Sequence, residues 1–404
     1  MASYKNIKQK IINDPLYGFI TVSSPLLFDL IEHPIFQRLR WISQTGLSCL
    51  VYPGAHHTRF HHSLGCMHLM QKALNTLKQK GIEISEEEEN AACIAILLHD
   101  IGHGPFSHAL ENSIIKVNHE AISLYLFNQL NEEFEGALDL AIQIFKGEYK
   151  RRFFNQLISS QLDVDRLDYL MRDCFYTGVA EGTISIDRLI SMMNVINDEI
   201  VIEAKGIYSV EKFILARMFM YWQVYLHKTG VGAEYLLMKI LKRAHEVYCD
   251  NSDLWITPEL AFFFKNTIEI DDLDDEVMKH FLRLSDSDIG TCIKQWSKST
   301  DETLARISNM LLNRNLYKVE ETEKKQTKDY FSKKLSLETK IVESEYFSGI
   351  IPVKNLAYDK QKPIKLLMKD SRVLSLDKVS KQLDFKVLSK SVEKYYFFYL
   401  KTKS

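Results

Sequence analysis

One apolar stretch that ends in a cluster of histidines constrains this fold more than any other feature. Residues 91–98 (AACIAILL) are uniformly apolar, and Ser85 and Glu88 before them have the spacing of a helix capping box. The string HDIGHGPFSH follows at residues 99–108 and holds three histidines and one aspartate. A buried helix that delivers imidazole and carboxylate groups at its C-terminal end predicts a helical core around a polar site.

This cluster predicts a metal site. The whole chain of 404 residues has 13 histidines, so three within ten residues are a local concentration. Imidazole and carboxylate together suit Mn, Fe, Zn or Ni better than Ca. The alternative is a capped helix end with hydrogen-bonded core histidines, and the density of such groups favours the metal.

Three other segments carry groups suited to a phosphate site. YPGAHHTRFHHS at residues 52–63 offers four histidines and one arginine, as a further ligand and a phosphate clamp or as surface groups. A helix over residues 163–173 would align Asp165, Tyr169 and Asp173 on one face, although an amphipathic helix with Arg–Asp pairs gives the same pattern. Residues 217–225 hold a helical stripe of one arginine and two tyrosines, which also fits a core stripe with a snorkelling arginine.

The spacing of apolar residues predicts a mainly α protein with a smaller α/β C-terminal region. Helices are expected over 59–80, 86–98, 155–175, 184–196 and 210–248, with a further one opened by Pro105 and less distinctive ones over 250–315. Residues 318–340 read as a linker or exposed helix, and 364–368 and 395–400 as strands. The expected domains are a helical core (1–248), a helical extension with a charged linker (249–340) and a small α/β region (341–404).

Charge and composition bear on the class of protein. Residues 1–320 carry 32 Lys and Arg against 42 Asp and Glu, whereas residues 321–404 carry 19 against 11. Such a basic C-terminal segment suits phosphates, nucleic acid, an acidic neighbouring subunit or simply solvent. The six cysteines form no C-x-x-C pair, the N-terminal residues have no apolar signal-peptide core, and the longest apolar run is too short for a bilayer. We therefore expect a cytoplasmic protein without membrane contact. The sequence has no P-loop and no G-x-S-x-G motif.

Six ordered strings carry a resemblance to the HD-domain superfamily, whose metal-ligand pattern is H…HD…D. They are NDPLYGFI, HPIFQRLR, YPGAHHTRFHHSLG, LLHDIGHGPFSHALE, DVDRLDYLMRDC and VYLHKTG, between about Lys10 and Lys228. The chain resembles most closely the deoxynucleoside triphosphate (dNTP) triphosphohydrolases typified by the vertebrate SAM-and-HD-domain enzyme, without the SAM module. The C-terminal third shows no such alignment.

The resemblance implies roles for individual residues. The metal ligands would be His62, His99, Asp100 and Asp165. The acid/base group would be His108, oriented by Glu111 where the family has Asp, with His103 and His119 as further pocket histidines. Substrate would be bound by Gln44, Arg59, Arg166, Tyr169, Asp173, Arg217 and Tyr225. Arg166 replaces a family lysine, which changes the geometry of phosphate binding, and Thr45 after Gln44 replaces a leucine.

The resemblance also implies regulation by nucleotides bound between subunits. Residues that match a guanine-nucleotide activator site are Lys10, Ile11, Asn13, Glu32, Gln37 and Arg40, with Glu32 in place of Asp. At a neighbouring dNTP activator site, Glu203 stands where the family has arginine, although Lys205 fits. We expect a homo-oligomer, a dimer or tetramer, with GTP or dNTP as activator.

The expected activity is hydrolysis of a dNTP to deoxynucleoside and triphosphate, with one tightly bound divalent metal (Fe, Mn, Zn or Ni) and Mg accompanying the nucleotide. One alternative is an HD phosphohydrolase for another nucleotide or a phosphodiester. Arg217 and Tyr169 argue against it, because a small phosphomonoester needs neither a triphosphate clamp nor a sugar platform. The other is a nucleic-acid-binding protein with a vestigial site, against which the intact ligand set argues.

Overall fold

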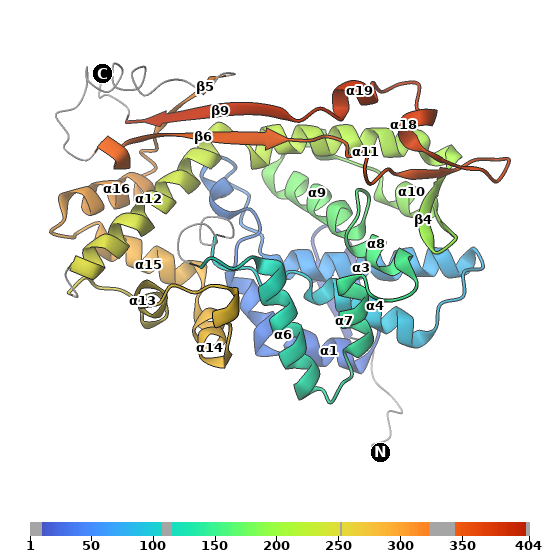
Figure 1. The fold of residues 1–404 in the computed structure, drawn as a ribbon, viewed down its shortest axis with the longest axis horizontal. Coiled ribbons are helices and arrows are strands. Elements are labelled where there is room, and N and C mark those ends of the chain that lie inside the picture. Colours follow the sequence, from blue (N-terminus) through green and yellow to red (C-terminus); the bar gives the residue numbers. More distant parts are fainter. Residues whose placement is uncertain (1–9, 107–114, 251–252, 323–343, 401–404) are drawn as a thin grey trace.

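The computed structural model describes residues 10–106, 115–250, 253–322 and 344–400. Helices dominate these ranges, and short strands gather mainly towards the C-terminal end of the chain (Figure 1). The predicted fold class is confirmed. Within the described ranges, no helix combines the length and apolar character needed to cross a bilayer.

Three helices form the centre of the molecule. α3 (Arg59–Gln79) packs against α4 (Glu86–Leu98) and against α9 (Val164–Thr177). The predicted capping box begins α4: Ser85 Oγ accepts from Glu88 N at 3.1 Å, and the Glu88 carboxylate accepts from Ser85 N at 3.0 Å. All of residues 91–98 are buried, so α4 anchors its C-terminal His99 and Asp100 in the core.

Shorter helices surround this centre. Before α9 they are α1 (Pro25–Glu32), α2 (Pro34–Gln37), α6 (His119–Glu133), α7 (Asp139–Lys146) and α8 (Arg152–Ile158). After α9 come α10 (Ile186–Ser191), α11 (Ile207–Met220), a π-helical turn (Tyr221–Tyr225) and α12 (Lys228–Asp250). The predicted helical extension is formed by α13 (Pro258–Lys265), α14 (Asp275–Arg283), α15 (Asp286–Trp296) and α16 (Glu302–Leu312).

The strands form three small sheets. β1 (Lys10–Asp14) and β2 (Gly18–Val22) make a hairpin. The second sheet has the order β3 (Met193–Ile196), β4 (Glu199–Glu203), β7 (Lys365–Leu367) and β8 (Val373–Ser375), with β4 and β7 parallel. In the third, β9 (Val392–Tyr399) lies between β5 (Lys318–Thr322) and β6 (Ser348–Asn355). Two short helices, α18 (Leu376–Val379) and α19 (Phe385–Leu388), complete the C-terminal region.

The C-terminal strands pack directly on the helical core. Tyr235 of α12 stacks on Phe398 of β9 with ring centroids 5.0 Å apart, and Tyr396 donates to the carbonyl of Leu226 at 2.7 Å. β6 and β9 run along α11 and α12 (Figure 1). One continuous apolar cluster extends from Ile20 to Leu400. The proposed domain boundaries stay a prediction.

Several element predictions need correction. Residues 184–196 are not one helix, because residues 193–196 pair with β4 as a strand. The helix expected over 155–175 is interrupted between α8 and α9, where residues 159–163 form a turn. Residues 318–322, expected in a linker or exposed helix, form a strand because the backbone of β9, which is distant in the sequence, pairs with them. The helix expected after Pro105 falls largely on residues 107–114, outside the described ranges.

Gly65 permits the close approach of α3 to α9. A Cβ at this position would overlap Asp168 Oδ1 and Arg172 Nη2. Both groups are fully buried and fixed in an ion pair, Asp168 Oδ2 lying 2.9 Å from Arg172 Nε. Neither side chain therefore has room to move aside.

We expect Gly65→Ala to lower the free energy of unfolding by about 1–3 kcal/mol, the usual cost of overpacking a buried contact. Gly290 in α15 is the matched control, because a Cβ there would meet nothing within 4 Å. Gly290→Ala should be neutral or stabilise by up to about 1 kcal/mol, as helix propensity dictates. Urea denaturation of both variants checks this, and equal stabilities would contradict the close-approach argument.

Candidate metal centre

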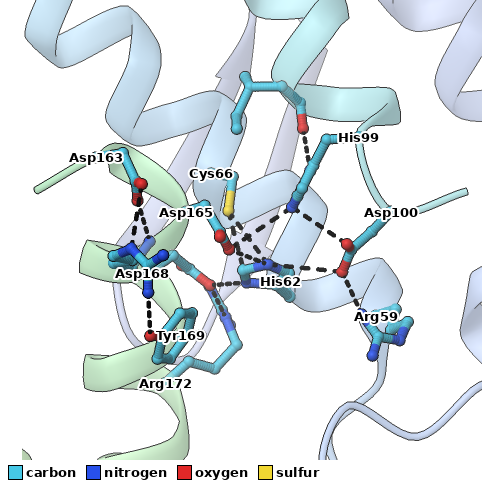
Figure 2. Close-up of polar contacts among 12 residues, drawn as sticks. Arg59, His62, Cys66, His99, Asp100, Asp163, Asp165, Asp168, Tyr169 and Arg172 are labelled. Carbon is cyan, nitrogen blue, oxygen red and sulfur yellow. Dashed lines mark hydrogen bonds and ion pairs between the residues drawn. The ribbon is translucent and has the colours of Figure 1, made fainter. Parts of the chain in front are cut away.

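The four predicted metal ligands lie next to one another. His62 comes from the first turn of α3, His99 and Asp100 from the end of α4, and Asp165 from the first turn of α9 (Figure 2). Asp165 Oδ1 lies 3.1 Å from His62 Nε2 and 3.6 Å from His99 Nε2, and Asp100 Oδ1 lies 3.4 Å from His99 Nε2. Three helix ends thus bring two imidazoles and two carboxylates together.

Both imidazoles present Nε2 to the cluster. His99 Nδ1 lies 2.6 Å from the carbonyl of Ile96, which only accepts hydrogen bonds, so Nδ1 carries the proton. His62 Nδ1 lies 2.7 Å from Asp168 Oδ2 and is oriented in the same way. His99 Nε2 is buried and has no hydrogen-bond partner. A cation bound by the cluster would satisfy this lone pair, so the residues fit a divalent metal.

The carboxylates of this cluster are held in their charged form. Burial raises the pKa of Asp165, but its contacts with His62 and His99 outweigh that effect and lower the pKa below its usual range. Burial likewise raises the pKa of Asp100, and the neighbouring His99 and Arg59 reverse the direction. Ionised carboxylates are the form that a cation needs.

Two of the predicted catalytic histidines lie beside the ligands. His103 Nε2 is 3.3 Å from Asp100 Oδ1, and the His103 ring stacks on His119 with centroids 3.9 Å apart. Burial lowers the pKa of His103 to about 3, and the charge of Arg59 acts in the same direction. The predicted acid/base pair, His108 and Glu111, lies outside the described residues.

Arg59 and Arg166 flank the centre on two sides. The guanidinium of Arg59, almost fully buried, forms an ion pair with the ligand Asp100. Arg166 directly follows the ligand Asp165 and donates to Ser160 O at 2.8 Å and to Tyr169 Oη at 3.3 Å. The predicted phosphate-binding groups therefore border the ligands.

An aromatic cluster extends from α9 to the π-helical turn. Tyr169 and Tyr225 meet edge to face at 5.9 Å, and Tyr225 also meets Tyr221 at 5.2 Å. Tyr225 Oη donates to Asp173 Oδ2 at 2.5 Å, while His57 Nε2 lies 2.7 Å from Asp173 Oδ1. The wider π turn brings Tyr225 into line with α9, as such turns often do at functional sites.

The remaining predicted substrate residues, Gln44 and Arg217, make their contacts with other parts of the chain. Gln44 N donates to His57 O at 3.0 Å, and its Oε1 is buried without a partner. Arg217 on α11 donates to Ala357 O at 2.6 Å and to Gln161 O at 3.3 Å. Arg217 therefore contacts the C-terminal region as well as the turn before α9.

The predicted activator residues lie on the N-terminal hairpin and the first helices. Lys10, Ile11, Asn13, Glu32 and Arg40 are exposed, and Gln37 is half-buried. Arg40 Nε donates to Gln37 Oε1 at 2.7 Å, and the Arg40 guanidinium lies 3.6 Å from the centroid of the Phe60 ring. Their role in nucleotide binding stays a prediction.

Two residues of the site were not assigned a role from the sequence. Cys66, one turn after His62, belongs to a group with His62, His99 and Asp165 whose ligand atoms all lie within 4.8 Å. Asp168 orients His62 and is itself paired with Arg172. The i, i+4 spacing of His62 and Cys66 could have indicated that Cys66 lies beside the site. No local pattern could have linked Asp168 to His62, because the two residues are 106 positions apart.

We expect His99→Ala and Asp165→Ala to lose bound metal while keeping the helical fold, since each removes a direct ligand. Asp168→Asn should weaken metal binding by about 10- to 100-fold, the usual effect of losing a group that orients a histidine ligand, and should also lower stability because Arg172 then keeps only Asp14 as a charged partner. Elemental analysis and circular dichroism measure both properties. A folded His99→Ala or Asp165→Ala protein with its full metal content would show that the ligand assignment is wrong.

Comparison with known protein families agrees with this geometry. Residues 59–173 match the model of the HD domain, and residues 184–257 match the HD associated region. The first match begins at the helix of His62 and ends at Asp173, so it spans all four predicted ligands.

Similar proteins include characterised hydrolases and uncharacterised relatives. The uncharacterised protein YwfO of Bacillus subtilis is 31% identical, covering 92% of this chain and 88% of that protein. The deoxynucleoside triphosphate triphosphohydrolase SAMHD1 homolog of Dictyostelium discoideum is also 31% identical, over 76% of this chain and 59% of that protein. A crystal structure of a phosphohydrolase from Bacteroides thetaiotaomicron has a TM-score of 0.92 and 46% identity, covering 98% of this chain and all of that one.

Proposed function

Since the chain belongs to the HD-domain phosphohydrolase family, we propose that it is a metal-dependent dNTP triphosphohydrolase releasing deoxynucleoside and triphosphate. Relatives that are named deoxynucleoside triphosphate triphosphohydrolases, from Dictyostelium and human, support this substrate at 31% and 32% identity. The geometry of the site supports it independently.

The observation that carries the proposal is the placement of cationic and aromatic groups around one ligand set. Arg59 pairs with the ligand Asp100, and on α9 the ligand Asp165 is followed by Arg166 and, one turn later, by Tyr169. A phosphate at the ligand cluster would meet two guanidinium groups, and the attached sugar would meet an aromatic ring. A nucleoside polyphosphate has both parts in this order.

The reaction then divides among named groups. A divalent cation held by His62, His99, Asp100 and Asp165 would supply an activated water and would neutralise charge on the α-phosphate. Arg59 and Arg166 orient the phosphates so that the water oxygen attacks phosphorus as the bond to the 5′-oxygen breaks. The leaving 5′-oxygen takes a proton, which we assign to His108. Tyr169, Tyr225 and Asp173 position the sugar.

The remaining expectations for this site are also proposals. The metal is Fe, Mn, Zn or Ni, and Mg accompanies the nucleotide. The exposed activator residues on the N-terminal hairpin and first helices bind GTP or dNTP between the subunits of a homo-oligomer.

The direct test is incubation with each dNTP under several divalent metals, with and without GTP, followed by measurement of released triphosphate. We expect triphosphate from at least one dNTP, and a loss of about 10²–10⁴-fold in turnover for His108→Ala with its metal retained. Release of monophosphate or diphosphate instead would contradict the proposed bond. An unchanged kcat in His108→Ala would transfer the acid role to His119 or His103.

The position of Tyr169 predicts discrimination between sugars. Its ring is held by Tyr225 and by the hydrogen bond from Arg166 to its hydroxyl, so it leaves little room for a hydroxyl at C2′. A merely apolar pocket excludes an added group only by about 10²-fold, and a fixed ring excludes it better. We expect a dNTP to be cleaved in preference to its ribonucleotide, and Tyr169→Ala to narrow the difference.

The measurement is kcat/KM for a dNTP and its ribonucleotide in both proteins. The control is Tyr208→Ala, which removes a tyrosine that is 69% exposed at the start of α11 and should leave the ratio unchanged. If folded Tyr169→Ala discriminates as well as the parent protein, Tyr169 is an ordinary packing residue.

A further inference from the structure

A polar cavity lies where the HD core meets the C-terminal region. Its volume is about 310 Å³. The core contributes the turn at residues 159–161, Arg166, Arg217 and Tyr221; the C-terminal region contributes Lys354, Asn355, Leu356, Asp359 and Lys362. Four of these side chains are cationic, and Asp359 is the single acid among them. This lining has the composition of an anion site.

Arg217 gives the cavity a buried positive charge that no carboxylate contacts directly. The residue is only 6% exposed, and among the ion pairs of the described part of the chain none involves Arg217. Its guanidinium donates to the carbonyls of Gln161 and Ala357, which are neutral. Burial lowers the pKa of Arg217, and the charge of Arg166 adds to this. Burying an unpaired charge is costly, so an anion in the cavity would relieve that cost.

Hydrogen bonds from the core fix the backbone that carries the cavity's C-terminal lysines. The Gln161 side chain donates to the carbonyls of Asp359 and Lys362, and its Oε1 accepts from Asp359 N at 2.8 Å. Lys354 lies near the end of β6, whose register with β9 is fixed by pairing of Val353 with Lys394 and of Asn355 with Val392. Lys354 is exposed and paired with Glu393 at 3.2 Å, a surface contact that costs little to exchange.

The cavity and the metal centre share the first turn of α9. Arg166 lines the cavity, while Asp165, the residue before it, is a metal ligand. We propose that the cavity receives the terminal phosphates of the substrate, so that Lys354 and Lys362 of the C-terminal region are substrate-binding residues. This inference rests on the proposed function and extends it, because it makes the basic C-terminal region part of the active site.

The test compares Lys354→Gln, Lys362→Gln and the double variant with Lys360→Gln. Lys360 is an exposed lysine two positions from Lys362 that does not line the cavity, so it is a matched control. The probe is inorganic triphosphate, titrated into the metal-loaded protein by calorimetry, together with kcat and KM for a dNTP. Charged hydrogen bonds to phosphate are strong enough that we expect the double variant to bind triphosphate about 10-fold more weakly.

The same variant should raise KM by a similar factor with metal content and kcat retained, and Lys360→Gln should change neither quantity. Unchanged triphosphate affinity in the folded double variant, or an equal loss in Lys360→Gln, overturns the inference. Tighter binding of a single-stranded oligonucleotide than of triphosphate, with the same lysine dependence, also overturns it. If no dNTP is hydrolysed but triphosphate binding still depends on the two lysines, the proposed function fails and the cavity remains an anion site.

Discussion

The metal centre depends on a chain of buried charges that ends at His62. Arg172 is fully buried between Asp14 of β1, at 2.8 Å, and Asp168 on its own helix, at 2.9 Å, and Asp168 in turn holds His62 Nδ1 at 2.7 Å. Burial raises the pKa of Asp168, but Arg172 and His62 outweigh this and keep the carboxylate charged. Removing one member of such a chain leaves an uncompensated buried charge, which typically costs about 3–5 kcal/mol. The same contacts therefore join β1, α3 and α9 and orient the predicted ligand His62.

α9 connects the buried ion pairs to the candidate metal centre because different faces of the helix contribute to each. Asp165, Tyr169 and Asp173 recur every fourth residue and share one face of the helix, whereas Asp168 and Arg172 belong to the buried network. The buried Asp163 begins the helix, accepting from Arg166 N and from Ser160 N, each at 2.7 Å. Because one rigid helix positions a ligand, a phosphate-binding group and the aromatic platform, their relative spacing is set by helix geometry.

The ligand set predicted from the sequence rests on local signals, and the structure places its four side chains next to one another. His99 and Asp100 follow a helix whose capping box and apolar run are both contiguous, and the i, i+4, i+8 row on α9 needs only helical geometry. Two segments were predicted wrongly and one residue was missed for the same reason: each depends on a partner that is distant in the sequence. Residues 193–196 and 318–322 become strands only because β4 and β9 pair with them, and Asp168 gains its role only where α9 crosses α3. Tertiary pairing overrides local propensity in such segments.

Cys66 adds a sulfur atom to the groups that could bind a metal at this centre. Its Sγ lies 3.6 Å from His62 Nε2, so a thiol stands beside two imidazoles and the carboxylate of Asp165. Burial raises the pKa of Cys66 well above its usual value, and His62 lowers it only in part, so binding of a metal through this sulfur would have to displace its proton. The thiolate is the form that binds metals, and a neutral thiol is a weak ligand. The two Nε2 atoms and the ionised carboxylates are thus the stronger donors, a mixed nitrogen and oxygen set that suits first-row divalent cations and does not require the soft metals that select sulfur.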